Sequence, residues 1–259
     1  MIRQPRSLVT GSIRTGFGRE LCHDQAMSLP SDVITFAHRG ARSEERENTP
    51  AAFERALERG ARGLESDAWL SSDGEVVLVH DEVSRHGLRR VHVGRSGAAR
   101  LATFGIPRLA DLYEELGTDY ELSIDVKTRD AARPMIDVAE SFGAARRLWL
   151  CTPSLSLLGE LRKDEVRCHL VHSQRRRAID RPLERHAADL ADLGIDAMNM
   201  HHTEWSTGLV SLFHRFDVAA FAWDVQEVRH IRTVLSMGLD ALYSDHVDRM
   251  VATVAEWSG

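Results

Sequence analysis

The sequence predicts an α/β protein, a (β/α)8 TIM barrel formed by residues 33–259. Eight short runs rich in apolar and β-branched residues follow one another, and most are separated by one amphipathic segment of helix length. This alternation is typical of repeated βα units with a parallel sheet. The first run also lacks the Gly-x-Gly-x-x-Gly loop common after the first strand of an open sheet. A closed barrel is therefore favoured.

The elements can be placed in order along the chain. The first strand ends in His-Arg-Gly, and Thr49 and Pro50 then predict an N-cap and a first helical turn, in a helix that ends near Gly60. Residues 71–106 contain the extra strand-like run EVVLVH and an Arg- and Gly-rich segment, which predict a small hairpin and an insertion over one rim of the barrel. The predicted strands are VITFAHR (33–39), GLESDAWL (63–70), YELSIDV (120–126), LWLCT (148–152), VRCHLVHS (166–173), AMNMHH (197–202), VAAFAWDV (218–225) and ALYSD (241–245).

Residues 1–32 are expected to form an N-terminal extension outside the barrel, disordered or peripheral. Arg14, Arg19 and Glu20 interrupt any apolar segment of the kind found in a secretory signal. The early part contains Arg and Ser and little acid, as a transit peptide does, but we favour a disordered tail or an initiation codon upstream of a true start near Met27. A cytoplasmic location is expected.

Composition excludes several classes of partner. The net charge is -6 and the basic residues are mixed with acidic ones, so no nucleic-acid-binding surface is predicted. No apolar run approaches the roughly 18 residues of a membrane span, so no integral membrane segment is expected. Cys22, Cys151 and Cys168 lack Cys-x-x-Cys spacing, which predicts packing residues in a reducing compartment and no zinc cluster.

Carboxylates mark the ends of two predicted strands. In such barrels function collects where the strands end, and residues two apart on a strand face the same side. Glu65 and Asp67, and Asp125 and Lys127, have this spacing. Three converging carboxylates resist ionisation unless a cation lies between them, and oxygen ligands favour Mg²⁺ or Ca²⁺. The alternative is that Glu65 and Asp67 form structural salt bridges with neighbouring arginines.

The order of these motifs resembles the glycerophosphodiester phosphodiesterase family of the phospholipase-C-like phosphodiesterase superfamily. The resemblance runs from AHRGARSEERENTPAAFERALERGARGLESDAWLSSDGEVVLVHD (37–81) through IPRLADLYEEL and LSIDVK to FAWDV and GLDALYSD. It implies a (β/α)8 barrel enzyme that uses one divalent cation, Mg²⁺ or Ca²⁺, to hydrolyse a small-molecule glycerophosphodiester to an alcohol and glycerol 3-phosphate. A role in lipid or glycerol metabolism would follow.

The resemblance also implies roles for individual residues. A divalent ion can polarise phosphoryl oxygens, two imidazoles can exchange protons near neutral pH, and Arg and Lys can bind phosphate. Trp223 matches an aromatic residue near the glycerol group, although a barrel-core aromatic is an equal interpretation. The implied metal ligands are Glu65, Asp67 and Asp125, the acid and base are His38 and His80, and the phosphate ligands are Arg39 and Lys127.

Several positions depart from the family pattern. Asp125 stands where Glu is usual, Arg46 replaces the proline that often precedes Glu-Asn-Thr, and Gln226 replaces the Asn of Trp-x-Val-Asn. The segment after His80 is shorter and more basic than usual. These departures affect the expected substrate more than the expected chemistry. Glu47, His201 and His202 receive no role, and the oligomeric state is left open.

Two alternatives to this hydrolysis were kept. The first is a lysophospholipase D or sphingomyelinase-D-like phosphodiesterase whose lasting product is a cyclic phosphate. The second is a non-catalytic barrel that binds a phosphorylated ligand. His38 and His80 argue against the second, because a binding protein does not need two proton-transfer groups.

Overall fold

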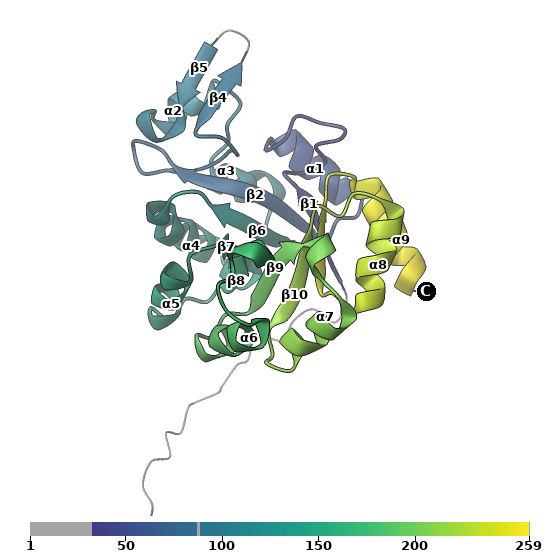
Figure 1. Cartoon of the computed structure of the whole chain (residues 1–259). Helices are drawn as coiled ribbons and strands as arrows, with labels where there is room; N and C mark the ends of the chain where they lie inside the picture. The colour runs from purple at the N-terminus through teal and green to yellow at the C-terminus, as the bar shows by residue number, and fades with distance from the viewer. Residues whose placement is uncertain (1–32, 87–88, 259) are drawn as a thin grey trace, which may run out of the picture. The chain divides into compact units, whose positions relative to one another are not determined.

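Eight parallel strands close into a barrel in the computed structural model, which describes residues 33–86 and 89–258 (Figure 1). The strands pair in the order β1, β2, β6, β7, β8, β9, β10 and β11, and β11 pairs with β1 to close the ring. The predicted (β/α)8 barrel is confirmed, and each of the eight predicted runs contains one barrel strand. These are β1 (Ile34–His38), β2 (Gly63–Leu70), β6 (Glu121–Val126), β7 (Leu148–Thr152), β8 (His169–Ser173), β9 (Ala197–His201), β10 (Ala219–Trp223) and β11 (Ala241–Ser244).

Aromatic side chains fill the inside of the barrel. Phe36 on β1 stacks on Tyr243 with ring centroids 4.8 Å apart, and Trp149 on β7 lies 5.1 Å from Phe221 on β10. Since β7 and β10 are not neighbours in the ring, the second contact crosses the interior. The interior is thus a packed core and not a pore. Cys151 belongs to this cluster.

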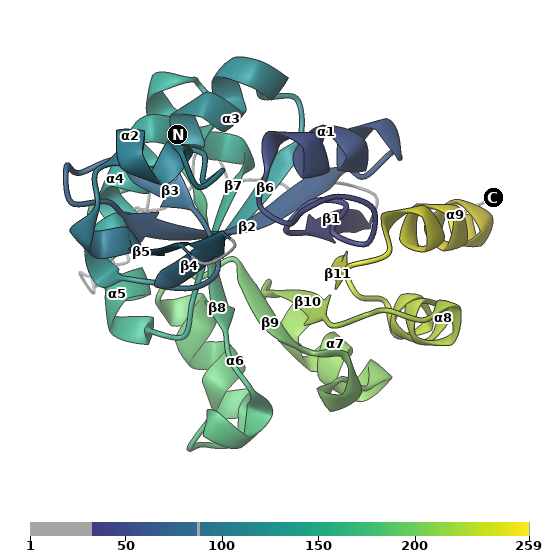
Figure 2. The ribbon, with the colours of Figure 1, turned by 90° about the horizontal axis from the view of Figure 1, so that it is seen from above.

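Helices surround the strands, as the view from above shows (Figure 2). Their apolar sides pack on the outer faces of the strands in one large buried cluster. The prediction that the cysteines are packing residues is confirmed for Cys151 and Cys168, which are buried and free, whereas Cys22 lies outside the described residues. The outer helices are α1 (Pro50–Glu58), α3 (Leu109–Leu116), α4 (Ala132–Ser141), α5 (Leu155–Lys163), α6 (Leu183–Asp192), α7 (Thr207–His214), α8 (Val228–Met237) and α9 (Val247–Ser258).

Helix α1 begins and ends at the predicted signals. The Thr49 side chain accepts a hydrogen bond from the Ala52 backbone N–H, and Pro50 is in the first turn. The helix ends at Glu58, with Arg59 as its C-cap. Gly60, the predicted cap, follows at φ +87°, one residue beyond the observed cap.

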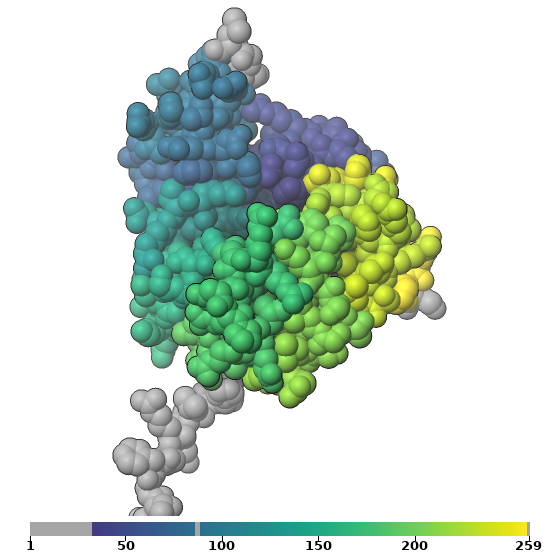
Figure 3. All heavy atoms as spheres, viewed as in Figure 1, coloured from purple at the N-terminus to yellow at the C-terminus, as the bar shows by residue number. Residues whose placement is uncertain are grey.

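An insertion follows the carboxyl end of β2, in agreement with the prediction for residues 71–106. Strand β3 (Val76–Leu78) runs antiparallel to β2, and β4 (Val83–His86) pairs with β5 (Arg89–His92). A 3-10 turn (Val93–Arg95) and α2 (Ala98–Ala102) complete the insertion, which has its own apolar cluster. Its blue atoms project from one end of the barrel (Figure 3).

No helix within residues 33–86 and 89–258 combines the length and apolar character needed to cross a membrane. This agrees with the absence of an apolar run of that length in the sequence. The predicted N-terminal extension, residues 1–32, lies outside the described residues.

The glycine of His-Arg-Gly permits a close approach between the β1–α1 loop and helix α1. Gly40 has φ +79°, and a Cβ atom there would lie 2.6 Å from the Ala52 carbonyl carbon. Gly74 has a similar φ of +86°, but a Cβ atom there meets nothing within 4 Å. Both glycines therefore have a left-handed backbone conformation, but an added Cβ atom would collide with neighbouring atoms only at Gly40 of the two.

We expect Gly40→Ala to lower the free energy of unfolding more than Gly74→Ala does. Both variants carry a left-handed alanine, which costs about 1–2 kcal/mol. Crowding adds about 1–3 kcal/mol at Gly40 alone. Urea unfolding of the two variants measures the difference, and equal losses would contradict the proposed crowding.

Candidate active site

The carboxyl ends of the barrel strands surround a pocket of about 570 Å³. Most side chains that line the pocket are polar or charged, as we expected for the end of the barrel where functional groups gather. The pocket is lined by His38, Arg39, Arg42, Glu65, Asp125, Ser173, Gln174, Arg175, Asn199, Trp223, Asp224, Gln226, Tyr243 and Asp245.

Three carboxylates meet at this mouth. Parallel pairing of β2 with β6 sets Asp67 beside Asp125, and Glu65 faces the same side as Asp67 because it lies two residues earlier. One oxygen from each of the three lies within 4.8 Å of the other two. Glu65 is 5% exposed and Asp67 is 2% exposed. This set of oxygen atoms fits a hard divalent cation.

Burial and mutual repulsion disfavour the charged forms of this cluster. Burial raises the pKa of Glu65 to about 8, and the neighbouring Asp67 and Asp125 carboxylates add to that rise, while His38 opposes it. Burial also raises the pKa of Asp125 to about 6, with Asp67 adding and Lys127 opposing. The Asp125 side chain keeps 42% of its surface open to the pocket, so burial acts more strongly on Glu65. A bound cation would favour the ionised forms.

Two basic side chains lie against the cluster. Lys127 Nζ is 2.7 Å from Asp67 Oδ1 and 3.9 Å from Asp125 Oδ2, and Arg39 Nε is 3.3 Å from Asp67 Oδ2. Burial lowers the pKa of Lys127, but Asp67 and Asp125 outweigh it and leave the pKa raised. Asp67 therefore has the arginine salt bridge that the alternative interpretation expected. Glu65 forms no ion pair with any arginine among the described residues.

His38 is held by two acidic groups. Its Nδ1 lies 2.6 Å from Asp245 Oδ1, and its Nε2 lies 3.8 Å from Glu65 Oε2. Burial lowers the pKa of His38, but Glu65 and Asp245 outweigh this effect and the net pKa is raised. Asp245 was noted as a strand-end residue, but its contact with His38 could not be read from the sequence.

His80 is placed differently from His38. It lies just after β3 and lines a neighbouring cavity of about 590 Å³ with Glu47, Asn48 and Asp81, and it is not in the lining of the His38 pocket. Its Nδ1 is 2.7 Å from Asp81 Oδ1, and its backbone carbonyl accepts a hydrogen bond from Trp69. Its charge still lowers the pKa of Asp125, so the electrostatic effect of His80 reaches the carboxylate cluster.

The Glu-Asn-Thr segment supports the cluster. The Ser66 hydroxyl donates to Asn48 Oδ1 at 2.8 Å, and the Asn48 amide lies 3.5 Å from Asp67 Oδ2. Glu47 accepts from Arg39 Nη1 at 3.1 Å. Sequence reasoning gave Asn48 no separate role, although its position in the Glu-Asn-Thr motif was the available signal.

Trp223 lies at the boundary between the barrel core and the pocket, and its contact with a glycerol group stays a prediction. It packs against the interior aromatic cluster and also lines the pocket. The Arg175 guanidinium lies over the Trp223 ring, 4.3 Å from its centroid, which adds an unpredicted positive charge to the pocket wall.

The sequence matches the model of the Glycerophosphoryl diester phosphodiesterase family over residues 38–249. That match covers most of the chain. The chain belongs to this family. Membership confirms the resemblance seen in the motifs.

Relatives of the family agree with this assignment. The glycerophosphodiester phosphodiesterase of Caldanaerobacter subterraneus is 31% identical over 40% of this chain, and the match spans 49% of that protein, less than two thirds of its length. The enzyme of the same name from Bacillus altitudinis is 25% identical over 83% of this chain and 96% of its own. An Oleispira antarctica phosphodiesterase has the same fold, with a TM-score of 0.73 and 18% identity over 88% of this chain and 97% of its own.

We expect the carboxylate cluster of this family member to bind Mg²⁺ or Ca²⁺ more tightly at pH 8 than at pH 6. The raised pKa values mean that Glu65 and Asp125 hold protons toward pH 6 that a cation must displace. The gain is about tenfold per pH unit while one proton is displaced. Calorimetric titration at both pH values measures it, with Glu65→Gln as the variant that should weaken the pH dependence. Equal affinities at the two pH values would contradict the expectation.

Proposed function

We propose that the protein hydrolyses a glycerophosphodiester to an alcohol and glycerol 3-phosphate with one divalent cation. The observation that carries the proposal is the meeting of three carboxylates, His38 and two basic side chains at one barrel mouth. The Oleispira antarctica neighbour, described in complex with the product sn-glycerol-3-phosphate, supports this substrate class.

Glu65, Asp67 and Asp125 would hold the cation, either Mg²⁺ or Ca²⁺. Such an ion, when bound, polarises phosphoryl oxygens and helps to activate the attacking oxygen. The donor set fits this role because burial and repulsion raise the pKa of two of the three carboxylates. The short side chain of Asp125, where the family usually has Glu, leaves room for a water molecule on that side.

His38 and His80 would exchange the protons of the reaction. One imidazole would accept a proton from the attacking oxygen, and the other would donate a proton to the leaving alkoxide. Asp245 on Nδ1 of His38 orients that ring and leaves Nε2 toward Glu65. Asp81 contacts Nδ1 of His80 in the same way. The two rings line neighbouring cavities, so the substrate would extend between them.

Arg39 and Lys127 would bind the phosphate. Both lie within 3.3 Å of Asp67, which places their positive charges beside the carboxylate cluster. Arg39 Nε is buried and makes no hydrogen bond with the described residues, so it can donate to a phosphate oxygen. Trp223, in the opposite part of the lining, would contact the glycerol group. A cytoplasmic location and a role in lipid or glycerol metabolism stay predictions.

We expect the metal-depleted protein to release no glycerol 3-phosphate from glycerophosphocholine, and added Mg²⁺ or Ca²⁺ to restore release. The cation is required because the carboxylates alone cannot stabilise the phosphoryl charge. Enzymatic quantification of glycerol 3-phosphate, with and without EDTA, measures this. A lasting cyclic phosphate would favour the sphingomyelinase-D-like alternative. Calorimetric binding of the cation without turnover of any diester would overturn the proposal.

His38→Gln and His80→Gln should each lower kcat by about 10² to 10⁴-fold, the usual loss when a proton-transfer group is removed. His214→Gln is the matched control, because His214 Nε2 also contacts an aspartate, Asp240, at 2.8 Å but lies at the end of α7 outside the pocket. Steady-state kinetics measures the effect. A folded His80→Gln variant with normal kcat would remove His80 from the proton transfer.

A further inference from the structure

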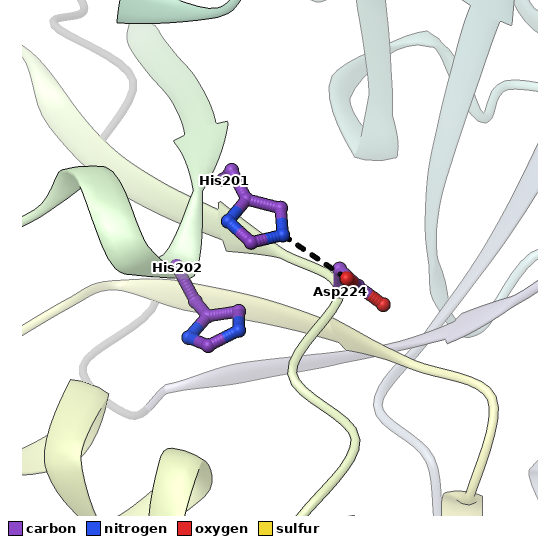
Figure 4. Close-up of side chains that lie close together, drawn as sticks. All are labelled: His201, His202 and Asp224. Atoms are coloured by element: carbon purple, nitrogen blue, oxygen red, sulfur yellow. Dashed lines mark hydrogen bonds and ion pairs between the residues drawn. The ribbon is translucent and has the colours of Figure 1, made fainter.

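A second cluster of possible metal ligands lies at the ends of β9 and β10 (Figure 4). It consists of His201, His202 and Asp224, and one ligand atom from each lies within 4.8 Å of the other two. The reaction proposed above uses none of these three side chains. His201 and His202 were noted in the sequence without a role, and Asp224 ends the next strand run.

The geometry is close to that of a tetrahedral site. His201 Nε2 lies 3.0 Å from Asp224 Oδ2. Two ligands of a tetrahedral zinc ion with bonds of about 2.0–2.1 Å are roughly 3.3 Å apart. The His202 ring lies 4.6 Å from the His201 ring, centroid to centroid, and offers a third ligand atom within 4.8 Å of the other two.

Both imidazoles can offer a nitrogen lone pair. The Nδ1 of His201 lies 2.7 Å from the Thr203 hydroxyl and 3.3 Å from the Thr203 backbone N–H. In the tautomer that donates Nδ1–H to the hydroxyl, Nε2 has a lone pair for a metal. Neither ring nitrogen of His202 hydrogen-bonds to any residue that the structure describes.

Asp224 is held in an unusual backbone conformation. Its φ is +62°, which non-glycine residues seldom adopt, and Gln226 Nε2 donates to its Oδ1 at 3.2 Å. This leaves Oδ2 directed at His201. Strained backbone is concentrated at binding and catalytic sites, where surrounding contacts maintain it.

We propose that His201, His202 and Asp224 bind a divalent transition-metal ion of the Zn²⁺ class. Two imidazole nitrogens and one carboxylate oxygen suit zinc, whereas the three-carboxylate cluster suits Mg²⁺ or Ca²⁺. Three protein ligands leave a fourth position for water or an anion. Asp224 also lines the catalytic pocket, so the ion would lie at its rim. The inference concerns binding and does not depend on the proposed hydrolysis.

The surroundings are compatible with a cation. Arg175 is a neighbouring positive charge, and its guanidinium lies 4.3 Å from the centroid of the Trp223 ring. Glu204 Oε1 lies 3.6 Å from Arg175 Nη1 and offsets that charge. The His230 ring on α8 lies 4.4 Å from the His202 ring and supplies a further imidazole beside the three ligands.

Calorimetric titration of Zn²⁺ into the full chain tests the proposal, with excess Mg²⁺ present to occupy the carboxylate cluster. We expect one saturable site that is lost in the double variant His201→Asn/His202→Asn. Asp224→Asn should also weaken it, and asparagine tolerates the left-handed backbone. Thr203→Val should reduce affinity by about 10–100-fold, the usual effect of losing a group that orients a metal-binding histidine.

Two controls separate this site from ordinary surface binding. His214→Gln removes another histidine that contacts an aspartate, at a place without a second imidazole within ring contact among the described residues, and should leave Zn²⁺ affinity unchanged. Glu65→Gln should leave it unchanged as well. Co²⁺ should give the visible absorption of a tetrahedral nitrogen and oxygen site in the wild type and in both controls, and not in the double variant. Equal Zn²⁺ affinity in the wild type and the folded double variant would overturn the proposal, as would absence of saturable binding.

Discussion

The need to balance three carboxylates in one small space determines the arrangement of the barrel mouth. The register of β2 against β6 leaves Asp67 beside Asp125, and Glu65 follows from the alternation of the strand. The fold distributes positive groups unevenly among them. Asp67 contacts both Arg39 and Lys127, while among the described residues Glu65 contacts the His38 ring and the Arg39 backbone N–H. The remaining negative charge is located where a divalent ion would be held.

Backbone strain occurs at this end of the molecule, as it also does at Glu165 and Asp217, which precede β8 and β10. Arg39, Asn48 and Asp224 all have positive φ, although none is glycine. Each left-handed residue costs about 1–2 kcal/mol. Packed aromatic rings inside the barrel and apolar helix faces outside it supply the opposing stability. The rigid barrel can therefore maintain a strained loop that a less stable framework would relax.

The fold was predictable because the pattern of a barrel is local. Each strand run and each helix signal, such as Thr49 followed by Pro50, is visible within a few residues. The carboxylate cluster was predictable because strand alternation fixes which way Glu65 and Asp67 face. Contacts between distant residues were not predictable: His38 and Asp245 are 207 positions apart and meet only because β11 closes the ring beside β1. The cavity that His80 lines was not predictable either, because its shape depends on how the insertion packs.

The separate apolar cluster of the insertion has a consequence for evolution. Val91, Leu101 and Phe104 belong to that cluster and not to the barrel core, so the insertion is a module with its own packing. His38 is fixed by the closure of the ring, whereas His80 follows β3 at the base of the module. Substitutions in the outer part of the module can therefore reshape the cavity beside His80 without disturbing the packing of the barrel or its carboxylates.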